Sequence, residues 1–309
     1  MRAARVVVIG SSNTDMVVKL GHLPAPGETV LGGAFVTAGG GKGANQAIAA
    51  RRLGAEVTLI ARVGADAFGA SALSAFAADG VDTANVTVDP ESPSGVALIF
   101  VDDAGENMIA VAPGANRRLA ETDVERAAPA IKHAHVVVAQ LEVPLATVEA
   151  GMRLARAAGA ITLLNPAPAP ELDSPGRLLA HVDIVNPNRT ELGRLTHAKI
   201  STIAEASAAA RGLLARGVRG VVVTLGADGA LVVDASGVEH VPAYRVRTVD
   251  ATGAGDAFTA GLAVALAEGA DLRTAARYAN AAAALTTTRL GAQPSMPVRA
   301  DVDRLAAMA

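Results

Sequence analysis

A glycine-rich turn, Gly253-Ala254-Gly255-Asp256, places a carboxylate beside backbone that could bind an anion. After it, Phe258, Leu262 and Ala265 have the spacing of one apolar helical face, which predicts that a helix begins at the turn. Free N–H groups and the helix dipole favour an anion at such an N-terminus, and glycines let a phosphate approach the backbone closely. Residues 253–255 are therefore expected to bind an anion.

The carboxylate of Asp256 is unusual next to an anion site. Its charge would repel a phosphate, so its presence is explained if it accepts a proton or if Mg²⁺ shields the charge. A structural alternative stays open, because aspartate is a preferred residue at helix N-termini and the glycines could simply form the turn. Other motifs are needed to choose between a catalytic acid and a helix cap.

A second polar site is expected near the start of the chain. Val6 to Ile9 is a continuous apolar run, which predicts a strand buried on both faces, and Asn13, Thr14 and Asp15 follow its carboxyl end. Ligands bind at that end of the strands in open α/β sheets. The short polar side chains of Asn13 and Asp15 could hold hydroxyl groups, and an ordinary polar turn is the alternative.

The glycine loop at residues 39–46 runs into a predicted helix and presents Lys42 and Asn45. It is not a Walker A motif, because Gly43 follows the lysine where serine or threonine is required. It fits the dinucleotide fingerprint only formally, because the next predicted strand ends in Arg62 and not in an acid. One cation and one amide instead suit a polar, hydroxyl-rich ligand.

Three further motifs could contribute, and each has a structural alternative. Asn188 and Glu191 could orient water on Mg²⁺, or they could form a capping box at a helix start. Thr224-x-Gly226-x-x-Gly229 could hold nucleotide phosphates, or it could be a β-turn before a strand. Glu142, at a strand end, could bind a substrate hydroxyl or could be a solvated side chain.

An α/β scaffold is predicted to position these motifs. Apolar strands are expected at 6–9, 57–61, 136–139, 161–164, 183–185 and 221–225, with helices at 67–79, 144–158 and 204–216. Alternating residues at 16–38 and a hairpin at 96–101 and 107–111 interrupt this order. We therefore expect one α/β domain over 1–309, in which a doubly wound, mostly parallel sheet is sandwiched by helices. Strands from about 16–38 and 95–112 should form a small β-sheet lid over the carboxyl edge.

The composition argues against several classes of function. A net charge of −3 gives no basic surface for nucleic acid. The chain has no cysteine, which excludes disulfides and thiolate chemistry and fits a cytoplasmic protein. It has no apolar run of about 20 residues that could span a membrane, and residues 1–10 lack the layout of a signal peptide.

The predicted sites fit phosphoryl transfer when they are taken together. They supply an anion site with an adjacent carboxylate, a polar site of sugar size and a lid. Catalysis of that reaction is mostly positioning and charge stabilisation. Asp256 would accept the proton of a substrate hydroxyl, and the lid would exclude water that competes with it.

The motifs resemble those of the ribokinase-like, phosphofructokinase-B family of sugar kinases over essentially the whole chain. The resemblance rests on Asn13-Thr14-Asp15, Gly40-Gly41-Lys42-Gly43-Ala44-Asn45-Gln46, Asn188-x-x-Glu191 and Asp250-x-x-Gly253-Ala254-Gly255-Asp256. It implies a ribokinase-like fold and ATP-dependent phosphorylation of D-ribose at the 5-hydroxyl, with Mg²⁺. It also implies that Asp256 is the general base and that Gly253, Ala254 and Gly255 form the anion hole.

The resemblance further implies which residues surround each ligand. The sugar would be bound by Asn13, Thr14, Asp15, Gly41, Lys42, Gly43, Ala44, Asn45, Glu142 and Asp256. ATP would be bound by Asn188, Glu191, Thr224, Leu225, Gly226, Ala227, Asp228, Gly229, Gly255 and Asn280. A monovalent cation, usually K⁺, would be held by Asp250, Thr252, Thr286, Arg289, Gly291 and Ser295, mostly through carbonyl groups. A homodimer formed through the lid sheet is also implied.

Two other readings of the function stay open. One is a kinase for another small furanose or a nucleoside, such as deoxyribose, fructose or adenosine. A low content of aromatic residues, with five Phe, two Tyr and no Trp, argues weakly against a nucleoside. The other is a non-catalytic sugar-binding module, because a fold alone does not establish catalysis. The intact Asp256 and its anion site argue against that module.

The chain departs from the family pattern at one position: Asn280 stands where some members carry a histidine near the adenine.

Overall fold

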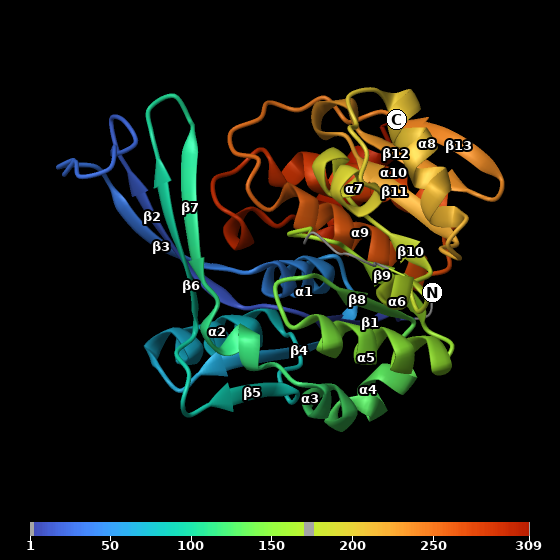
Figure 1. Ribbon diagram of the computed structural model, residues 1–309, viewed down its shortest axis with the longest axis horizontal. Coiled ribbons are helices and arrows are strands. Elements are labelled where there is room, and N and C mark those ends of the chain that lie inside the picture. Colours follow the sequence, from blue (N-terminus) through green and yellow to red (C-terminus); the bar gives the residue numbers. More distant parts are fainter. Residues whose placement is uncertain (1–2, 170–175, 309) are drawn as a thin grey trace.

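The computed structural model describes residues 3–169 and 176–308. Within these ranges its largest element is a nine-stranded sheet, with the order β13-β12-β11-β10-β9-β8-β1-β4-β5 (Figure 1). Neighbours from β11 to β5 pair in parallel, and β12 and β13 add an antiparallel edge. The strands are β1 (Arg5–Ile9), β4 (Glu56–Gly64), β5 (Val86–Asp89), β8 (Val136–Ala139), β9 (Ile161–Leu164), β10 (Ile184–Val185), β11 (Gly220–Thr224), β12 (Ala230–Asp234) and β13 (Gly237–Val241).

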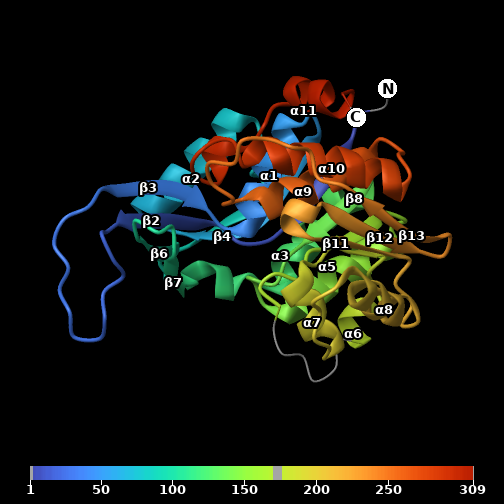
Figure 2. The ribbon, with the colours of Figure 1, turned by 90° about the horizontal axis from the view of Figure 1, so that it is seen from above.

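Helices cover both faces of this sheet, as Figure 2 shows. One layer holds α1 (Lys42–Arg52), α2 (Ala67–Asp79), α9 (Ala254–Ala267), α10 (Leu272–Thr286) and α11 (Arg299–Ala306). The other holds α3 (Glu121–Arg126), α4 (Ala128–His133), α5 (Leu145–Ala157), α6 (Gly176–Leu179), α7 (Arg189–Thr196) and α8 (Ile203–Leu214). None of the helices in the described ranges is both long and apolar enough to cross a membrane.

The apolar run that predicted β1 is explained by these two layers. Val6 and Val8 pack into the core under one helix layer, whereas Val7 and Ile9 pack into the core under the other. A strand that is covered on both faces has no polar side, so its sequence does not alternate. The predicted doubly wound sheet is confirmed.

The order of the strands changes direction at β1. From β1 the chain builds outward through β4 and β5 on one side, and later through β8, β9, β10 and β11 on the other. Ligands of open α/β sheets bind at the carboxyl ends of the strands where the order reverses. The ends of β1 and β8 are therefore the expected place for a binding site.

A separate four-stranded sheet, which we call the lid sheet, projects from one end of the molecule (Figure 1). Its order is β3-β2-β6-β7, with β2 (Asn13–Lys19), β3 (Phe35–Gly40), β6 (Gly95–Val101) and β7 (Asn107–Ala112). The chain passes between the lid sheet and the rest of the fold at four places: residues 10–12, 41, 90–94 and 113. The small separate sheet predicted from these segments is confirmed, but β2 begins three residues earlier than expected. Asn13, Thr14 and Asp15 therefore lie on a strand and not in a loop.

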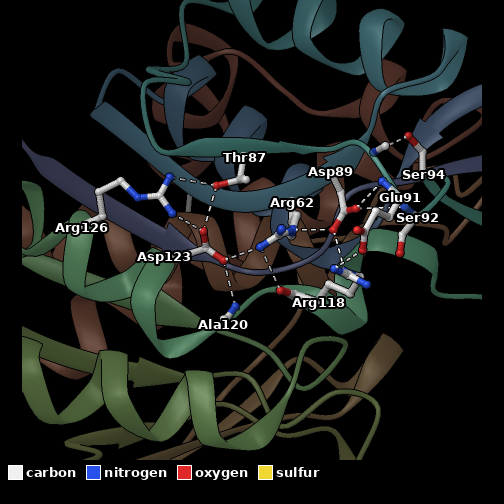
Figure 3. Close-up of polar contacts among 11 residues, drawn as sticks. Arg62, Thr87, Asp89, Glu91, Ser92, Ser94, Arg118, Ala120, Asp123 and Arg126 are labelled. Atoms are coloured by element: carbon white, nitrogen blue, oxygen red, sulfur yellow. Dashed lines mark hydrogen bonds and ion pairs between the residues drawn. The ribbon is translucent and has the colours of Figure 1, made fainter.

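An ionic cluster fixes the base of the β6–β7 hairpin (Figure 3). The Arg62 guanidinium on β4 contacts Asp89 at 2.8 Å and Asp123 at 3.1 Å. Arg118, which follows β7, contacts Asp89 at 2.9 Å. Although burial alone would raise it, hydrogen bonds and these arginines lower the pKa of Asp89 to about 2. Because Asp89 precedes the hairpin and Arg118 follows it, their ion pair joins both of its ends to the main sheet.

Candidate active site

The predicted functional residues converge at the carboxyl ends of β1 and β8. The N-termini of α1 and α9 meet there, and the lid strand β2 begins there. Direct contacts link the groups, because Asn45 on α1 binds Asp256 on α9 and Lys42 on α1 binds Glu142 after β8. Sequence positions as far apart as 45 and 256 therefore form one site.

The Asp256 carboxylate does not cap its own helix. The N-cap of α9 is Gly253, and the carboxylate accepts hydrogen bonds from two side chains of α1 instead. Asn45 Nδ2 donates to Oδ2 at 2.8 Å, and Gln46 Nε2 donates to Oδ1 at 2.9 Å. Burial raises the pKa of Asp256, although Lys42 and the two amides act in the opposite direction. The structural alternative of a helix cap is therefore wrong, and the geometry suits a general base.

The two helix N-termini at the site differ in their free hydrogen-bond donors. At α1, Lys42 N donates to Glu142 Oε2 at 3.0 Å, and Ala44 N donates to the Ser11 carbonyl at 2.8 Å. At α9, the N–H groups of Gly255 and Asp256 donate to no acceptor in the described part of the chain. Only α9 therefore offers unpaired N–H groups to an anion.

Two glycines at the site have different roles, because Gly43 is needed for packing and Gly255 leaves space for a ligand. At Gly43, a Cβ atom would lie 2.6 Å from the backbone of Gly10 and Ser11, so glycine lets α1 pack directly on the end of β1. At Gly255, a Cβ atom would meet nothing within 4 Å. Gly255 therefore leaves space open in front of the α9 N-terminus, which is where a phosphate would lie.

Glu142 contacts the protein in a way that sequence analysis did not predict. One carboxylate oxygen, Oε2, accepts from both the Ser11 hydroxyl and Lys42 N. Glu142 therefore caps α1 from outside the helix, and its second oxygen is left for a ligand. Ser11 was missed because one serine between a strand and a polar turn carries no motif.

Several charges face one another across the site. Burial lowers the pKa of Lys42, but the nearby Asp256, Glu142, Glu191 and Asp15 outweigh it, so the net pKa is raised. Burial raises the pKa of Asp15 to about 6, and the charges of Glu142 and Asp256 add to this effect. Lys42 is therefore a cation among four acids, and Asp15 titrates close to neutral pH.

Replacing Asp15 by asparagine is expected to stabilise the free protein. The pKa of Asp15 is about 6 in the folded protein, against an ordinary value of 3.8, so between these values the folded protein binds more protons than the unfolded chain. The free energy of unfolding should therefore fall as pH rises from about 4 to 6, and asparagine removes this loss. Thermal denaturation without ligand should give the variant a higher Tm at pH 7 and an equal Tm near pH 3.5. A difference in Tm that does not change with pH would contradict the assignment.

Three residues expected to bind sugar lie outside the cluster. Thr14 lies between Asn13 and Asp15 on β2, so its side chain points to the opposite face of the lid sheet. Gly43 and Ala44 use their N–H groups on Ser11, and the Ala44 side chain is fully buried in the core. The structure brings Asn13, Asp15, Lys42, Asn45, Glu142 and Asp256 together at the carboxyl ends of the strands.

Asn188 and Glu191 form the capping box that was the structural alternative for this motif. Asn188 Oδ1 accepts from Glu191 N at 2.8 Å, and Glu191 Oε2 accepts from Asn188 N at 2.8 Å. Burial raises the pKa of Glu191, which also acts electrostatically on Lys42 and Asp256. The capping box therefore holds a carboxylate beside the site, and the two readings do not exclude each other.

A cavity of about 1030 Å³ opens beside the α9 N-terminus. Eight of the ten residues expected to bind ATP line it: Asn188, Thr224, Gly226, Ala227, Asp228, Gly229, Gly255 and Asn280. Leu225 instead packs in the core, and Glu191 lies outside the lining. Sequence analysis missed the wall formed by residues 242–246. Asn280 holds the start of that wall, because its Nδ2 donates to the Pro242 carbonyl at 3.3 Å and to the preceding Val241 carbonyl at 3.1 Å.

Asp250 joins two of the segments that were expected to hold a monovalent cation. Its Oδ1 accepts from Thr252 Oγ1 at 2.7 Å, and its Oδ2 accepts from Gly291 N at 2.8 Å. Although burial alone would raise it, these hydrogen bonds lower the pKa of Asp250, which is therefore ionised at neutral pH. An ionised carboxylate is a hard oxygen ligand of the kind that fits a hard cation.

The remaining cation residues contribute differently. The hydroxyls of Thr286 and Ser295 donate to the carbonyls of Ala282 and Ala292, at 3.0 and 2.7 Å. These bonds use the hydroxyl hydrogens and leave the hydroxyl oxygens, like the carbonyls of the same residues, able to accept a cation. The Arg289 side chain is exposed. No cluster of three or more His, Asp or Glu side chains that could hold a metal occurs in residues 3–169 and 176–308.

Comparisons with known proteins agree with this geometry. Residues 3–299 match the family described as pfkB family carbohydrate kinase. The ribokinase of Haemophilus influenzae is 38% identical over 294 residues, 95% of each chain. The deoxyribokinase of Salmonella typhi is 39% identical over 293 residues, 94% of this chain and 95% of that one. A structure of Arabidopsis thaliana ribokinase complexed with ribose and ATP matches with a TM-score of 0.91 and 33% identity, covering 99% of this chain and 100% of that chain.

The fold and the enzyme class predicted from the sequence are thereby confirmed. The ribokinase structure shares the mostly parallel central sheet and the separate small sheet. The family match extends from β1 to the start of α11, so it includes every element that borders the site. The chain is an ATP-dependent sugar kinase and belongs to the pfkB family of carbohydrate kinases.

Proposed function

We propose that this kinase transfers the γ-phosphoryl group of ATP to the 5-hydroxyl of D-ribose. The observation that carries the proposal is the position of Asp256, which lies beside the free N–H groups of α9 and binds Asn45 at 2.8 Å. The relatives named ribokinase, and the related structure with ribose and ATP, support ribose as the substrate. The products are ribose 5-phosphate and ADP.

Protein groups are placed to assist the proton transfer and to stabilise the charge on the transferred phosphoryl group. Asp256 accepts the proton as the O–H bond of the sugar breaks and the new O–P bond forms. The bond between the γ-phosphorus and the bridging oxygen breaks, and its electron pair leaves with ADP. The N–H groups of Gly255 and Asp256 stabilise the charge on the transferred group, as preorganised donors do in phosphoryl transfer.

Two metal ions complete the proposal. Mg²⁺ is held mainly by the ATP phosphates and by water, because it keeps several waters, and Glu191 is placed to orient one of them. K⁺ is held by Asp250 and by carbonyls of the segments at 252 and 286–295. When bound, Mg²⁺ supplies charge neutralisation for the phosphates and K⁺ orders the loop before α9.

Deoxyribose is the second candidate substrate, because a deoxyribokinase is as similar to this chain as the ribokinases are. The two sugars differ by one hydroxyl. A site that hydrogen-bonds a hydroxyl rejects an analogue without it, since its buried polar groups are then left unpaired. Asn45 Oδ1 is buried and has no hydrogen-bond partner in the described residues, so it is an acceptor available to a sugar hydroxyl.

The proposal is tested by following ADP release with Mg-ATP on ribose, 2-deoxyribose, fructose and adenosine, each with K⁺ and with Na⁺. We expect the highest kcat/KM on ribose and a higher value with K⁺ than with Na⁺. A preference for another acceptor would overturn ribose as the substrate while the kinase reaction stands. Equal rates with both cations would contradict the K⁺ site at Asp250.

We also propose that two copies associate through their lid sheets. Apolar side chains are exposed on neighbouring positions of both outer strands, with Phe35 at 62%, Val36 at 56%, Met108 at 49% and Ile109 at 54%. Neighbours on a strand point to opposite faces, so both faces of the lid sheet are apolar. Monomers rarely expose such contiguous apolar area, and a second lid sheet is its proposed cover.

The dimer should be visible by sedimentation at micromolar protein, and Phe35→Lys with Met108→Lys should convert it to monomer. These two residues share the face of the lid sheet that Asp15 does not, so the sugar side is left unchanged. A wild-type protein that sediments as a monomer would contradict the proposal.

We place the reaction in the cytoplasm, which the absence of cysteine supports.

A further inference from the structure

A circuit of buried side chains lies beneath the Asp256 carboxylate. Gln46, which is 1% exposed, is at its centre. Its Nε2 donates to Asp256 Oδ1 at 2.9 Å and to Asn165 Oδ1 at 3.1 Å. Its Oε1 accepts from Gln140 Nε2. The side chain therefore uses both amide hydrogens and its oxygen on protein groups.

The circuit returns to the helix that carries Asp256. Asn165 Nδ2 donates to the Asn186 carbonyl at 2.9 Å, and Asn186 Oδ1 accepts from Thr259 Oγ1 at 2.8 Å. Thr259 lies three residues after Asp256, about one turn along α9. Two points on the same helix are thus tied to the ends of β9 and β10, which fixes the rotation of α9 about its axis.

The ionised carboxylate dictates how these amides are oriented. A carboxylate without a proton only accepts hydrogen bonds, so Gln46 must present its nitrogen to Asp256. Its oxygen then faces Gln140, which must donate. The orientation of each amide is therefore consistent with a charged Asp256 and would be disturbed by a protonated one.

We propose that Gln46 is a positioning residue for catalysis, which orients the Asp256 carboxylate and stabilises its ionised form. This inference rests on the proposed role of Asp256 as the base. Gln46 is buried and its hydrogen-bonding groups are all used, so it acts on the reaction only through Asp256. Because a hydrogen bond to the charged form favours that form, losing it should make Asp256 harder to ionise.

The test compares Gln46→Met with the wild type across pH, with ATP saturating and the sugar concentration varied, so that kcat and KM are both obtained. Methionine is similar in size but lacks the donor. We expect kcat at pH 7 to fall about tenfold, KM for the sugar to change less than about threefold, and the acid limb of kcat to move up by about one pH unit. The other charged groups that face Asp256 are Lys42, Glu142, Asp15 and Glu191, and all remain in the variant.

Gln46→Glu separates an electrostatic role from a steric one. Glutamate keeps the shape and the oxygen that accepts from Gln140, so a purely steric role predicts a milder effect than methionine. A second carboxyl beside Asp256 instead makes the pair share a proton, which should move the acid limb further than methionine does. Thr147→Val is the control. Thr147 lies on α5, and the substitution removes its buried hydrogen bond of 2.7 Å to the Leu119 carbonyl. It should lower Tm without moving the acid limb.

The outcomes distinguish this inference from the role of Asp256. If Asp256→Asn is inactive and Gln46→Met keeps the acid limb of the wild type, the positioning role of Gln46 is wrong and the base stands. If Asp256→Asn still turns over, the base assignment fails whatever Gln46 does. The inference is also overturned if Gln46→Met loses no more kcat than Thr147→Val does for a comparable loss of Tm.

Discussion

Asp256→Asn is expected to lower kcat by about 10³-fold and to leave sugar binding within a few-fold. Asparagine has nearly the same shape but cannot accept the proton of the sugar hydroxyl. The variant should fold, because it replaces a buried charge whose ionisation burial opposes. Initial rates and calorimetric titration with ribose measure the two quantities separately.

The matched control for this variant is Asp183→Asn. Asp183 and Asp256 are each 7% exposed, and Asp183 accepts from Thr162 N and Oγ1 at 3.0 Å. Asp183 precedes β10 at the amino end of the sheet, far from the site. We expect its variant to lose stability and keep kcat. Turnover by Asp256→Asn near the wild-type rate would remove Asp256 from the role of base.

Gly255→Ala is expected to lower kcat by about 10²-fold and to raise the stability of the protein. The new methyl group meets no protein atom within 4 Å, so nothing in the fold opposes it. Alanine in a helix is favoured over glycine by up to about 1 kcal/mol. The same methyl group would occupy the space in front of the free N–H groups and displace the transferred phosphoryl group.

Gly212→Ala separates the two effects. Gly212 lies within α8, and a Cβ atom there also meets nothing within 4 Å. Both variants should unfold at a higher temperature than the wild type, but only Gly255→Ala should lose activity. If Gly255→Ala keeps full activity, the phosphate does not bind against the first turn of α9.

Much of the scaffold is predictable because its signals are local. The helix at 67–79 and the strands at 136–139 and 161–164 occur at the predicted positions. For the helix, Asp66 caps the start and Gly80 ends it with a φ of 75°. For the strands, burial on both faces leaves an unbroken apolar run. Signals of this kind do not depend on the rest of the chain.

Two strands and one side-chain direction were not predictable in the same way. β5 and β13 are short strands at the two edges of the sheet, where one neighbour suffices and polar residues are tolerated. Their sequences therefore lack the apolar run of a central strand. Thr14 was grouped with Asn13 and Asp15 because the three residues form one motif of the family that the sequence resembles, whereas a strand turns alternate residues to opposite faces.

The two glycine loops show the limit for the site. Both the loop at 39–46 and the turn at 253–256 are glycine-rich and precede helices, so the sequence alone would allow free N–H groups at either helix start. They differ because Ser11 and Glu142 saturate the first, through contacts between segments up to about 100 residues apart. Sequence spacing contains no information on such contacts, so it could not tell which helix N-terminus stays open.

The placement of β2 has a consequence for how fast a sugar can leave. Asn13 and Asp15 belong to a strand of the lid sheet, whereas Lys42, Asn45 and Asp256 belong to the helices under the main sheet. In the proposed complex the sugar is the bridge between these two bodies. Moving the lid sheet outward then removes the contacts made by Asn13 and Asp15 in the same step and leaves those made by the helices. Sugar should therefore dissociate faster from the open form than from the closed form, so the frequency of lid opening sets an upper limit on how long the sugar is held by both bodies.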